Sequence, residues 1–156
     1  MLDEEEYWAR LAYEAELMRK EEPTFEPVNG DIRRWRGYII GTGIYEGGVF
    51  EIEIEVTRRF PFEPPIVKFL TKIWHPNIHP EQQRVCIGIL GKDWSPSITL
   101  TGVVEAIRML LNAPNPHDPL NREAAEQLLR DPKAFEKKAR EWVKKYARWD
   151  KIYQKK

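Results

Sequence analysis

The spacing of apolar residues predicts a helix at the start of the chain. Up to about Lys20, four apolar residues recur with the 3.6-residue period of one helical face. They are Trp8, Leu11, Ala15 and Met18. Because the proline of Glu21-Glu22-Pro23 cannot continue a helix, we expect the helix to end there and its apolar stripe to pack against the core.

A region of alternating apolar and polar residues follows and predicts an antiparallel sheet. The segment Val49–Val56 alternates strictly, with three glutamates on one face. Its apolar face consists of Phe50, Ile52, Ile54 and Val56. Trp35–Ile40 is predicted to pair with this strand through the turn-rich Gly41–Gly48, and Ile66–Leu70 is predicted as a third strand. Short strands joined by tight turns are typical of a meander.

A long irregular segment separates these strands from three further helices. Residues Lys72–Pro96 show little periodicity, and such segments inside a compact domain are uncommon and often functional. Helical periodicity resumes at Leu100, Val103, Val104, Ile107, Leu110 and Leu111. Asn121 is predicted to cap a short helix that runs to Arg130, and Asp131-Pro132 to begin a last helix. The apolar face of that helix is predicted to be Phe135, Ala139, Trp142 and Tyr146. This order of elements predicts an α+β fold.

Composition limits the classes of protein that the chain fits. With 156 residues, 42% of them hydrophobic, it has the size of one domain, 1–156, which ends in a short basic tail from about residue 150. The 25 basic and 25 acidic residues balance, so charge gives no reason to expect nucleic acid or a membrane as partner. A single cysteine forms no internal disulfide, and no secretion signal or membrane-spanning run is recognisable. We therefore expect a cytoplasmic protein, and a monomer because no heptad pattern is present.

Cys86 is the only cysteine, and its surroundings in the sequence leave two roles open. A lone cysteine is most often a small buried apolar residue. Cys86, however, lies in the irregular segment close to Gly88, with His75 and His79 earlier in the same stretch. A nucleophilic thiol needs access and a route to the thiolate, which sequence proximity to histidine does not establish. One cysteine and scattered histidines lack the spacing of a metal site, and no phosphate-binding loop is present.

Seven short motifs follow one another in a fixed order along the chain. They are Tyr45–Phe50, Phe60–Pro65, Lys72–Ile78, Val85–Ile87, Trp94–Pro96, Pro114–Pro116 and Asp118–Leu120. In this order and spacing the chain, from Tyr7 to about Trp149, resembles the ubiquitin-conjugating enzyme family. The resemblance implies an α+β fold with a four-stranded antiparallel sheet, an N-terminal helix and three later helices. The strand that periodicity does not indicate is expected just before Trp35 or near the loop.

The resemblance implies an acyltransferase that uses Cys86 as its nucleophile. Such an enzyme accepts ubiquitin or a ubiquitin-like modifier from an activating enzyme as a thioester. It then passes the modifier to a substrate lysine, usually with a ligase, here expected to be of the RING type. The activating enzyme uses the ATP, and no cofactor is expected on this chain.

Two other functions stay open at this point. A non-catalytic binding module of the same fold would hold the modifier or ligase without a thioester, but such relatives typically lack the cysteine. A thiol hydrolase or peroxidase of another fold would need His75 or His79 within about 2.6–3.2 Å of the Cys86 thiol. That reading leaves the other motifs unexplained.

The resemblance assigns roles to three residues besides the nucleophile. Asn77 matches a side-chain amide that donates to the oxyanion formed during transfer, although it can equally pin the loop. His75, with Pro76, matches a structural motif that fixes the turn and is not expected to be a base. Asp118 matches an acidic residue at the mouth of the catalytic groove that orients the incoming lysine. Its alternative role is to shape the turn before Pro119.

The resemblance also places partner contacts and shows three departures from the family pattern. Ligases are expected to dock on Pro61, Phe62, Ser95 and Pro96. The helix Asp3–Lys20 matches the region shared by activating enzyme and ligase. Gly88 stands where many members have an aspartate, which removes a carboxylate from the groove. The loop His79–Arg84 is one residue longer than usual and lacks its usual glycine, and the hairpin Gly41–Tyr45 is shortened.

Overall fold

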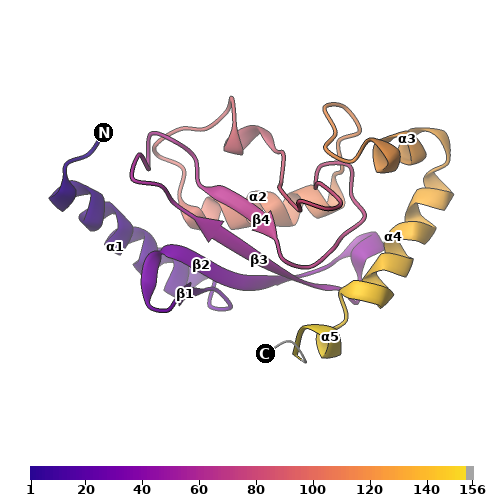
Figure 1. Cartoon of the computed structure of the whole chain (residues 1–156), viewed down its shortest axis with the longest axis horizontal. Coiled ribbons are helices and arrows are strands. Elements are labelled where there is room, and N and C mark those ends of the chain that lie inside the picture. Colours follow the sequence, from indigo (N-terminus) through magenta and orange to yellow (C-terminus); the bar gives the residue numbers. More distant parts are fainter. Residues whose placement is uncertain (154–156) are drawn as a thin grey trace.

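The structure, a computed structural model, describes residues 1–153 and has a four-stranded antiparallel sheet at its centre (Figure 1). The strands are β1 (Glu26–Val28), β2 (Asp31–Ile40), β3 (Val49–Glu55) and β4 (Ile66–Phe69). The helices are α1 (Glu4–Glu21), α2 (Leu100–Asn112), α3 (Arg122–Arg130), α4 (Pro132–Tyr146) and α5 (Trp149–Tyr153), with 3-10 turns η1 (Gly43–Tyr45) and η2 (Gly88–Leu90). The strands lie in sequence order, which confirms the α+β meander.

The inner face of the sheet packs against α2, which lies behind the strands in Figure 1. The predicted apolar face of β3 is buried throughout, and Ile54 lies opposite Trp35 of β2 and Val67 of β4. From α2, Val103 and Ile107 are wholly buried in the same core. Each such side chain contributes roughly 1.5–3 kcal/mol through burial, so the alternating strand and the periodic helix together hold the centre of the molecule.

The apolar stripe predicted for the first helix is wrong by one residue at its start. Leu11 and Met18 are buried as expected, but Trp8 is 39% exposed and Tyr7 is buried instead. The buried face runs through positions 7, 11, 14 and 18, which fits the helical period as well as the predicted stripe does. Its member Glu14 is a buried carboxylate, and a search for apolar residues alone passes over it.

The fourth strand lies before Trp35, one of the two expected places. Strand β1 has only three residues and includes Pro27, so it shows no alternation. Asn29 and Gly30 between β1 and β2 both have positive φ, 54° and 75°. Asn-Gly is a strong hairpin signal, so this dipeptide marks the strand where periodicity does not.

The C-terminal helices follow their predicted caps. The side chains of Asn121 and Asp131 accept hydrogen bonds from the backbone N–H groups of Ala124 and Ala134. Along α4, the predicted face is buried at Phe135 and Ala139 but only half-buried at Trp142 and Tyr146, and Val143 is buried beside them. Near the end of α4, the buried face is therefore shifted by one residue from the predicted face.

An additional short helix, α5, forms where a tail is predicted to begin. Its Trp149 ring lies edge-on to Tyr38 of β2, with ring centroids 5.1 Å apart. This contact holds α5 against the outer face of the sheet, opposite α2 (Figure 1). The last part of the predicted tail, residues 154–156, lies outside the described residues. None of the helices within 1–153 has the length and apolar character needed to cross a membrane.

Candidate active site

Cys86 lies on the surface, in the long segment between β4 and α2. An isolated antiparallel bridge pairs Ile78 with Val85 just before it. The backbone N–H of Cys86 donates to the carbonyl oxygen of Asn77 at 2.9 Å. The exposed thiol contradicts the interpretation of Cys86 as a buried apolar residue, and the backbone bond brings Asn77 beside it.

His75 is fully buried behind this pair, and both of its ring nitrogens are engaged. Nδ1 accepts a hydrogen bond from the backbone N–H of Asn77 at 3.0 Å, so Nε2 carries the proton and donates to the carbonyl of Leu110 at 2.9 Å. Burial lowers the pKa of His75 to about 4. The ring of Tyr45 stacks on it with centroids 5.9 Å apart. A neutral imidazole with no free nitrogen is suited to holding a turn, and it cannot take a proton from the Cys86 thiol.

The side chain of Asn77 is buried and joins two loops. Its Nδ2 donates to the carbonyl of Asn115, and its Oδ1 accepts from the N–H of Asn115, both at 2.8 Å. The carbonyl of Pro76 accepts from the N–H groups of Leu120 and Asn121. The loop that carries Asp118 is thus fastened next to Cys86 at both its ends. Since an amide has two N–H bonds, the bond to Asn115 leaves one for another acceptor.

Asp118 lies at the exposed tip of that fastened loop. Its φ is +58°, a left-handed conformation that aspartate tolerates better than most residues. Within residues 1–153, no hydrogen bond or ion pair engages its carboxylate. The backbone therefore makes the turn before Pro119, and the side chain stays available to an incoming group.

The two loops expected to dock ligases are joined by a hydrogen bond. Trp94 Nε1 donates to the carbonyl oxygen of Pro61 at 2.8 Å. Phe62 is 51% exposed, so its ring is accessible to a partner. Ser95 and Pro96 follow directly on Trp94, so the two loops form one surface with Phe62 projecting from it.

Two charged residues of α1 support this surface, and neither is indicated by the apolar pattern. Buried Glu14 accepts a hydrogen bond from the backbone N–H of Leu100 at 2.7 Å and pairs with Arg10 at 2.9 Å. Arg10 also donates to the carbonyl of Ile98 at 3.1 Å and lies over the Phe60 ring. The helix expected to contact partners is thereby tied to the loop that follows Pro96.

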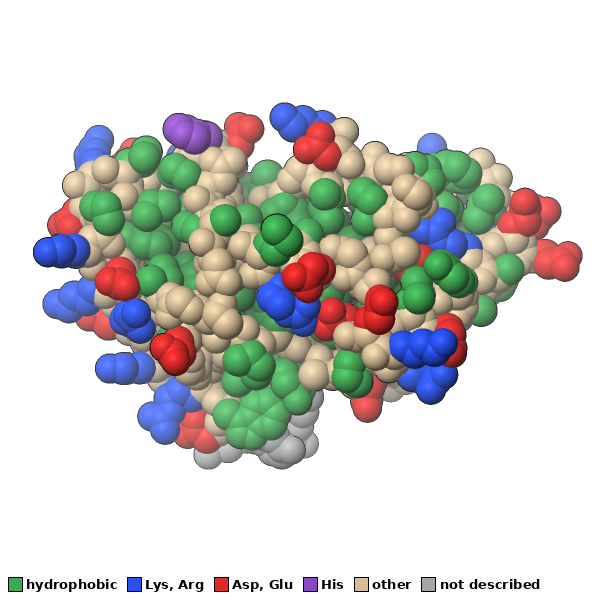
Figure 2. Space-filling model, turned by 180° about the vertical axis from the view of Figure 1, so that it is seen from behind, with side chains coloured by type: hydrophobic (Ala, Val, Ile, Leu, Met, Phe, Trp, Pro, Cys, Tyr) green, Lys and Arg blue, Asp and Glu red, His purple; other side chains and the backbone are tan. Residues whose placement is uncertain are grey.

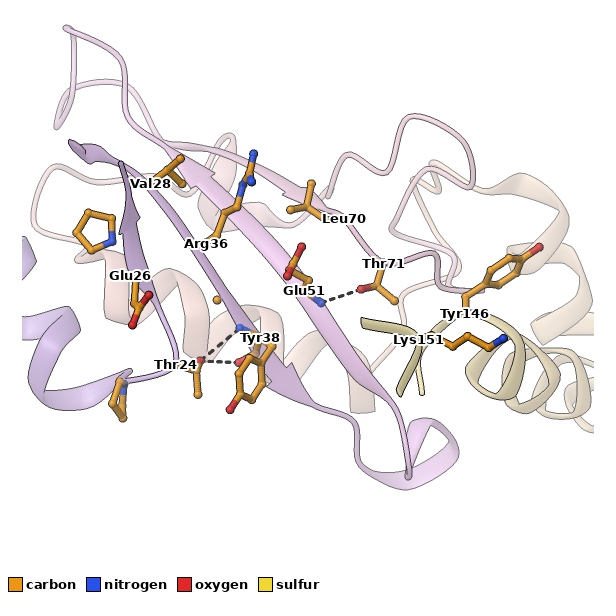
Figure 3. Close-up of a pocket in the computed structure, with 13 residues that line it drawn as sticks. Thr24, Glu26, Val28, Arg36, Tyr38, Glu51, Leu70, Thr71, Tyr146 and Lys151 are labelled. Atoms are coloured by element: carbon orange, nitrogen blue, oxygen red, sulfur yellow. Dashed lines mark hydrogen bonds between the residues drawn. The ribbon is translucent and has the colours of Figure 1, made fainter. Parts of the chain in front are cut away.

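A hollow of about 560 Å³ lies on the outer face of the sheet, but none of the predicted site residues lines it (Figure 3). Arg36, Tyr38 and Glu51 point into it from β2 and β3, and Lys151 approaches from α5. Among the residues that the structure describes, no group of His, Cys, Asp and Glu side chains is placed to hold a metal ion. This hollow is therefore separate from the predicted site around Cys86.

Several known proteins are similar to this chain in sequence. Residues 10–143 match the family model described as ubiquitin-conjugating enzyme. The chain is 38% identical to ubiquitin conjugating enzyme E2 B of Dictyostelium discoideum, over 89% of this chain and 97% of that protein. It is 40% identical to ubiquitin-conjugating enzyme E2 13 of Saccharomyces cerevisiae, over 80% of this chain and 82% of the relative.

A solved structure gives the same result at the level of the fold. The E2 domain of a Toxoplasma gondii ubiquitin conjugating enzyme superimposes with a TM-score of 0.83 and 36% sequence identity, covering 90% of this chain and 99% of that domain. The residues that match the family model begin within α1, end within α4 and include the loop that carries Cys86. Members of the matched family are transferases that act through a cysteine thioester. The chain belongs to the ubiquitin-conjugating enzyme family.

Proposed function

We propose that this protein carries ubiquitin as a thioester on Cys86 and transfers it to lysine side chains of substrate proteins. The observation that carries the proposal is the exposed thiol of Cys86, held beside Asn77 by the 2.9 Å backbone hydrogen bond. Ubiquitin, rather than a related modifier, is favoured because the relatives are named as ubiquitin-conjugating enzymes.

In the loading step, the Cys86 thiolate attacks the thioester carbonyl that links ubiquitin to the activating enzyme. A new carbon–sulfur bond forms at Cys86, and the thiolate of the activating enzyme leaves. The donor is a protein, so the acceptor thiol must lie on an open surface, as Cys86 does. ATP is used by the activating enzyme, and no cofactor on this chain takes part.

In the transfer step, a neutral lysine amine attacks the same carbonyl carbon. The carbon–nitrogen bond forms, the carbonyl oxygen becomes negatively charged, and collapse of this intermediate expels the Cys86 thiolate while the nitrogen loses a proton. The second N–H of Asn77 stabilises the oxyanion, a kind of interaction worth several kcal/mol. The carboxylate of Asp118 orients the lysine, and removal of water from the groove offsets its preference for the charged ammonium.

Partners bind on surfaces away from the thiol. RING-type ligases dock on Phe62, Pro61 and the neighbouring Ser95-Pro96, and α1 is shared by activating enzyme and ligase. The protein acts in the cytoplasm, since its free cysteine suits a reducing compartment. It acts as a monomer, since its sequence shows no heptad pattern.

The test is a loading reaction with purified components. The protein is incubated with ATP, ubiquitin and a ubiquitin-activating enzyme, and in parallel with a related modifier and its own activating enzyme. We expect a conjugate with ubiquitin only, which disappears when a reducing agent is added. A protein that is loaded only with the other modifier would refute the choice of ubiquitin, and absence of any conjugate would refute the carrier function.

A further inference from the structure

The carboxylate of Asp93 occupies the space in which a side chain at residue 88 would begin. A Cβ placed on Gly88 would overlap Asp93 Oδ2, and would lie 3.4 Å from Cγ and 3.7 Å from Cβ of the same residue. These are the three heavy atoms nearest to that position. Residue 88 is the position where many family members carry an aspartate. In this chain, Asp93 places a carboxylate beside the same position.

Backbone hydrogen bonds hold the two residues together. The N–H groups of Gly91 and Asp93 both donate to the carbonyl oxygen of Gly88, each at 2.9 Å, and so close the turn η2. The φ of Gly88 lies outside the left-handed range, so its backbone would accept an ordinary side chain. The group that a side chain at Gly88 would meet is therefore the end of the Asp93 side chain, which would have to move aside.

The Asp93 carboxylate is exposed, and it lies against a residue that is two positions from the nucleophile in the chain. Gly88 follows Cys86 by two residues, which places the two Cα atoms at most about 7 Å apart. Within residues 1–153, the carboxylate has no ion pair, and neighbouring Lys92 does not bond to it. A negative charge is therefore available to a group that approaches the Cys86 thioester.

We infer that Asp93 is a specificity-determining residue of the transfer step, which attracts the charged amine of the incoming lysine. The inference rests on the proposed function. Asp93 and Asp118 then provide two carboxylates from separate loops, and the missing aspartate at residue 88 does not prevent direct transfer to lysine. Asp93 draws in the ammonium group, which loses its proton to water before nitrogen attacks the thioester and the Cys86 thiolate leaves.

The first test separates charged from uncharged acceptors. Asp93→Asn removes the charge and keeps the shape, and Glu126→Gln on the exposed face of α3 removes a charge elsewhere. Each variant is loaded with ubiquitin and then given free lysine or hydroxylamine, which is uncharged at neutral pH. In Asp93→Asn, we expect normal loading, discharge to lysine slower by about two- to fivefold at low salt, and unchanged discharge to hydroxylamine. The difference should shrink at high salt, and Glu126→Gln should behave as wild type.

The second test moves the carboxylate back to residue 88. Asp93→Gly frees the space and should discharge to lysine as slowly as Asp93→Asn. Adding Gly88→Asp to Asp93→Gly should restore the wild-type rate. Equal rates of discharge to lysine in wild type and Asp93→Asn would overturn the inference. It would also be overturned if Asp93→Asn slowed discharge to lysine and to hydroxylamine equally, or if the loaded double variant discharged to lysine as slowly as Asp93→Gly. Failure of the wild type to load would instead refute the proposed function.

Discussion

The two hydrogen bonds between Asn77 and Asn115 limit what the Asn77 amide can do. They require the side-chain oxygen and one N–H, and they hold the loop that carries Asp118. Of the two roles that the sequence leaves open, pinning of the loop is present in the structure. The oxyanion role depends on the remaining N–H, so the two roles are compatible and are tested by different measurements.

Asn77→Asp and Asn77→Ala test both roles, because the discharge rate reports on the oxyanion and the stability reports on the pinned loop. Aspartate keeps an acceptor for the Asn115 N–H but cannot donate, whereas alanine loses both bonds. We expect both variants to load normally and to discharge to free lysine at least about 100-fold more slowly. Both variants should also lose at least about 1–3 kcal/mol in the free energy of unfolding, because alanine loses both bonds to Asn115 and aspartate sets a buried carboxylate oxygen against the Asn115 carbonyl oxygen. Single-turnover discharge and urea denaturation measure the two effects, and normal discharge in both variants would remove Asn77 from the mechanism.

The buried His75 predicts a dependence of stability on pH. Its pKa is about 4 in the folded protein against 6.5 without burial. As the pH falls from about 6.5 to 4, the unfolded chain takes up a proton that the folded chain does not, so folding loses about 3 kcal/mol over this range. Urea denaturation of wild type and His75→Gln at about pH 7 and about pH 5 measures the loss. His75→Gln should show a much weaker dependence, and an equal dependence in both proteins would contradict this assignment.

At the scale of elements, a regular helix or strand can be predicted from the residues within it, but a contact between two loops cannot. Strand β3 and helix α2 could be predicted because burial of one face sets their period. The bond from Trp94 to Pro61 joins residues 33 positions apart, and the Asp93 carboxylate meets Gly88 only because η2 closes. Neither contact has a periodic signature.

The paired loops predict an effect confined to ligase-dependent transfer. Phe62→Ala removes an exposed ring, so loading and stability should stay as in wild type. Ligase-stimulated discharge should fall by about tenfold, since aromatic side chains often dominate interfaces. Ile66→Ala is the matched control, because Ile66 of β4 is 54% exposed and lies outside the paired loops. Unchanged stimulation of Phe62→Ala by a RING ligase would refute the docking assignment.

At the scale of the whole molecule, the family and the fold could be predicted from motifs and periodicity. The position of α5 and the exposure of Cys86 could not. Acidic and basic side chains are interspersed over the face seen in Figure 2, as expected from the balanced composition. Helix α5 could not be predicted, because five residues carry little periodic signal and its position depends on the ring of Tyr38. The position of Cys86 on the surface is likewise a property of the folded chain.

The most direct test of the central claim is the intact mass of the protein after loading. Wild type and Cys86→Ala are each incubated with ubiquitin, the activating enzyme and ATP. Their intact masses are then measured with and without a reducing agent. We expect wild type to gain one ubiquitin less one water, to lose it on reduction, and the variant to gain nothing. A reduction-resistant adduct, or an adduct that persists in Cys86→Ala, would show that the modifier is not carried as a thioester on Cys86.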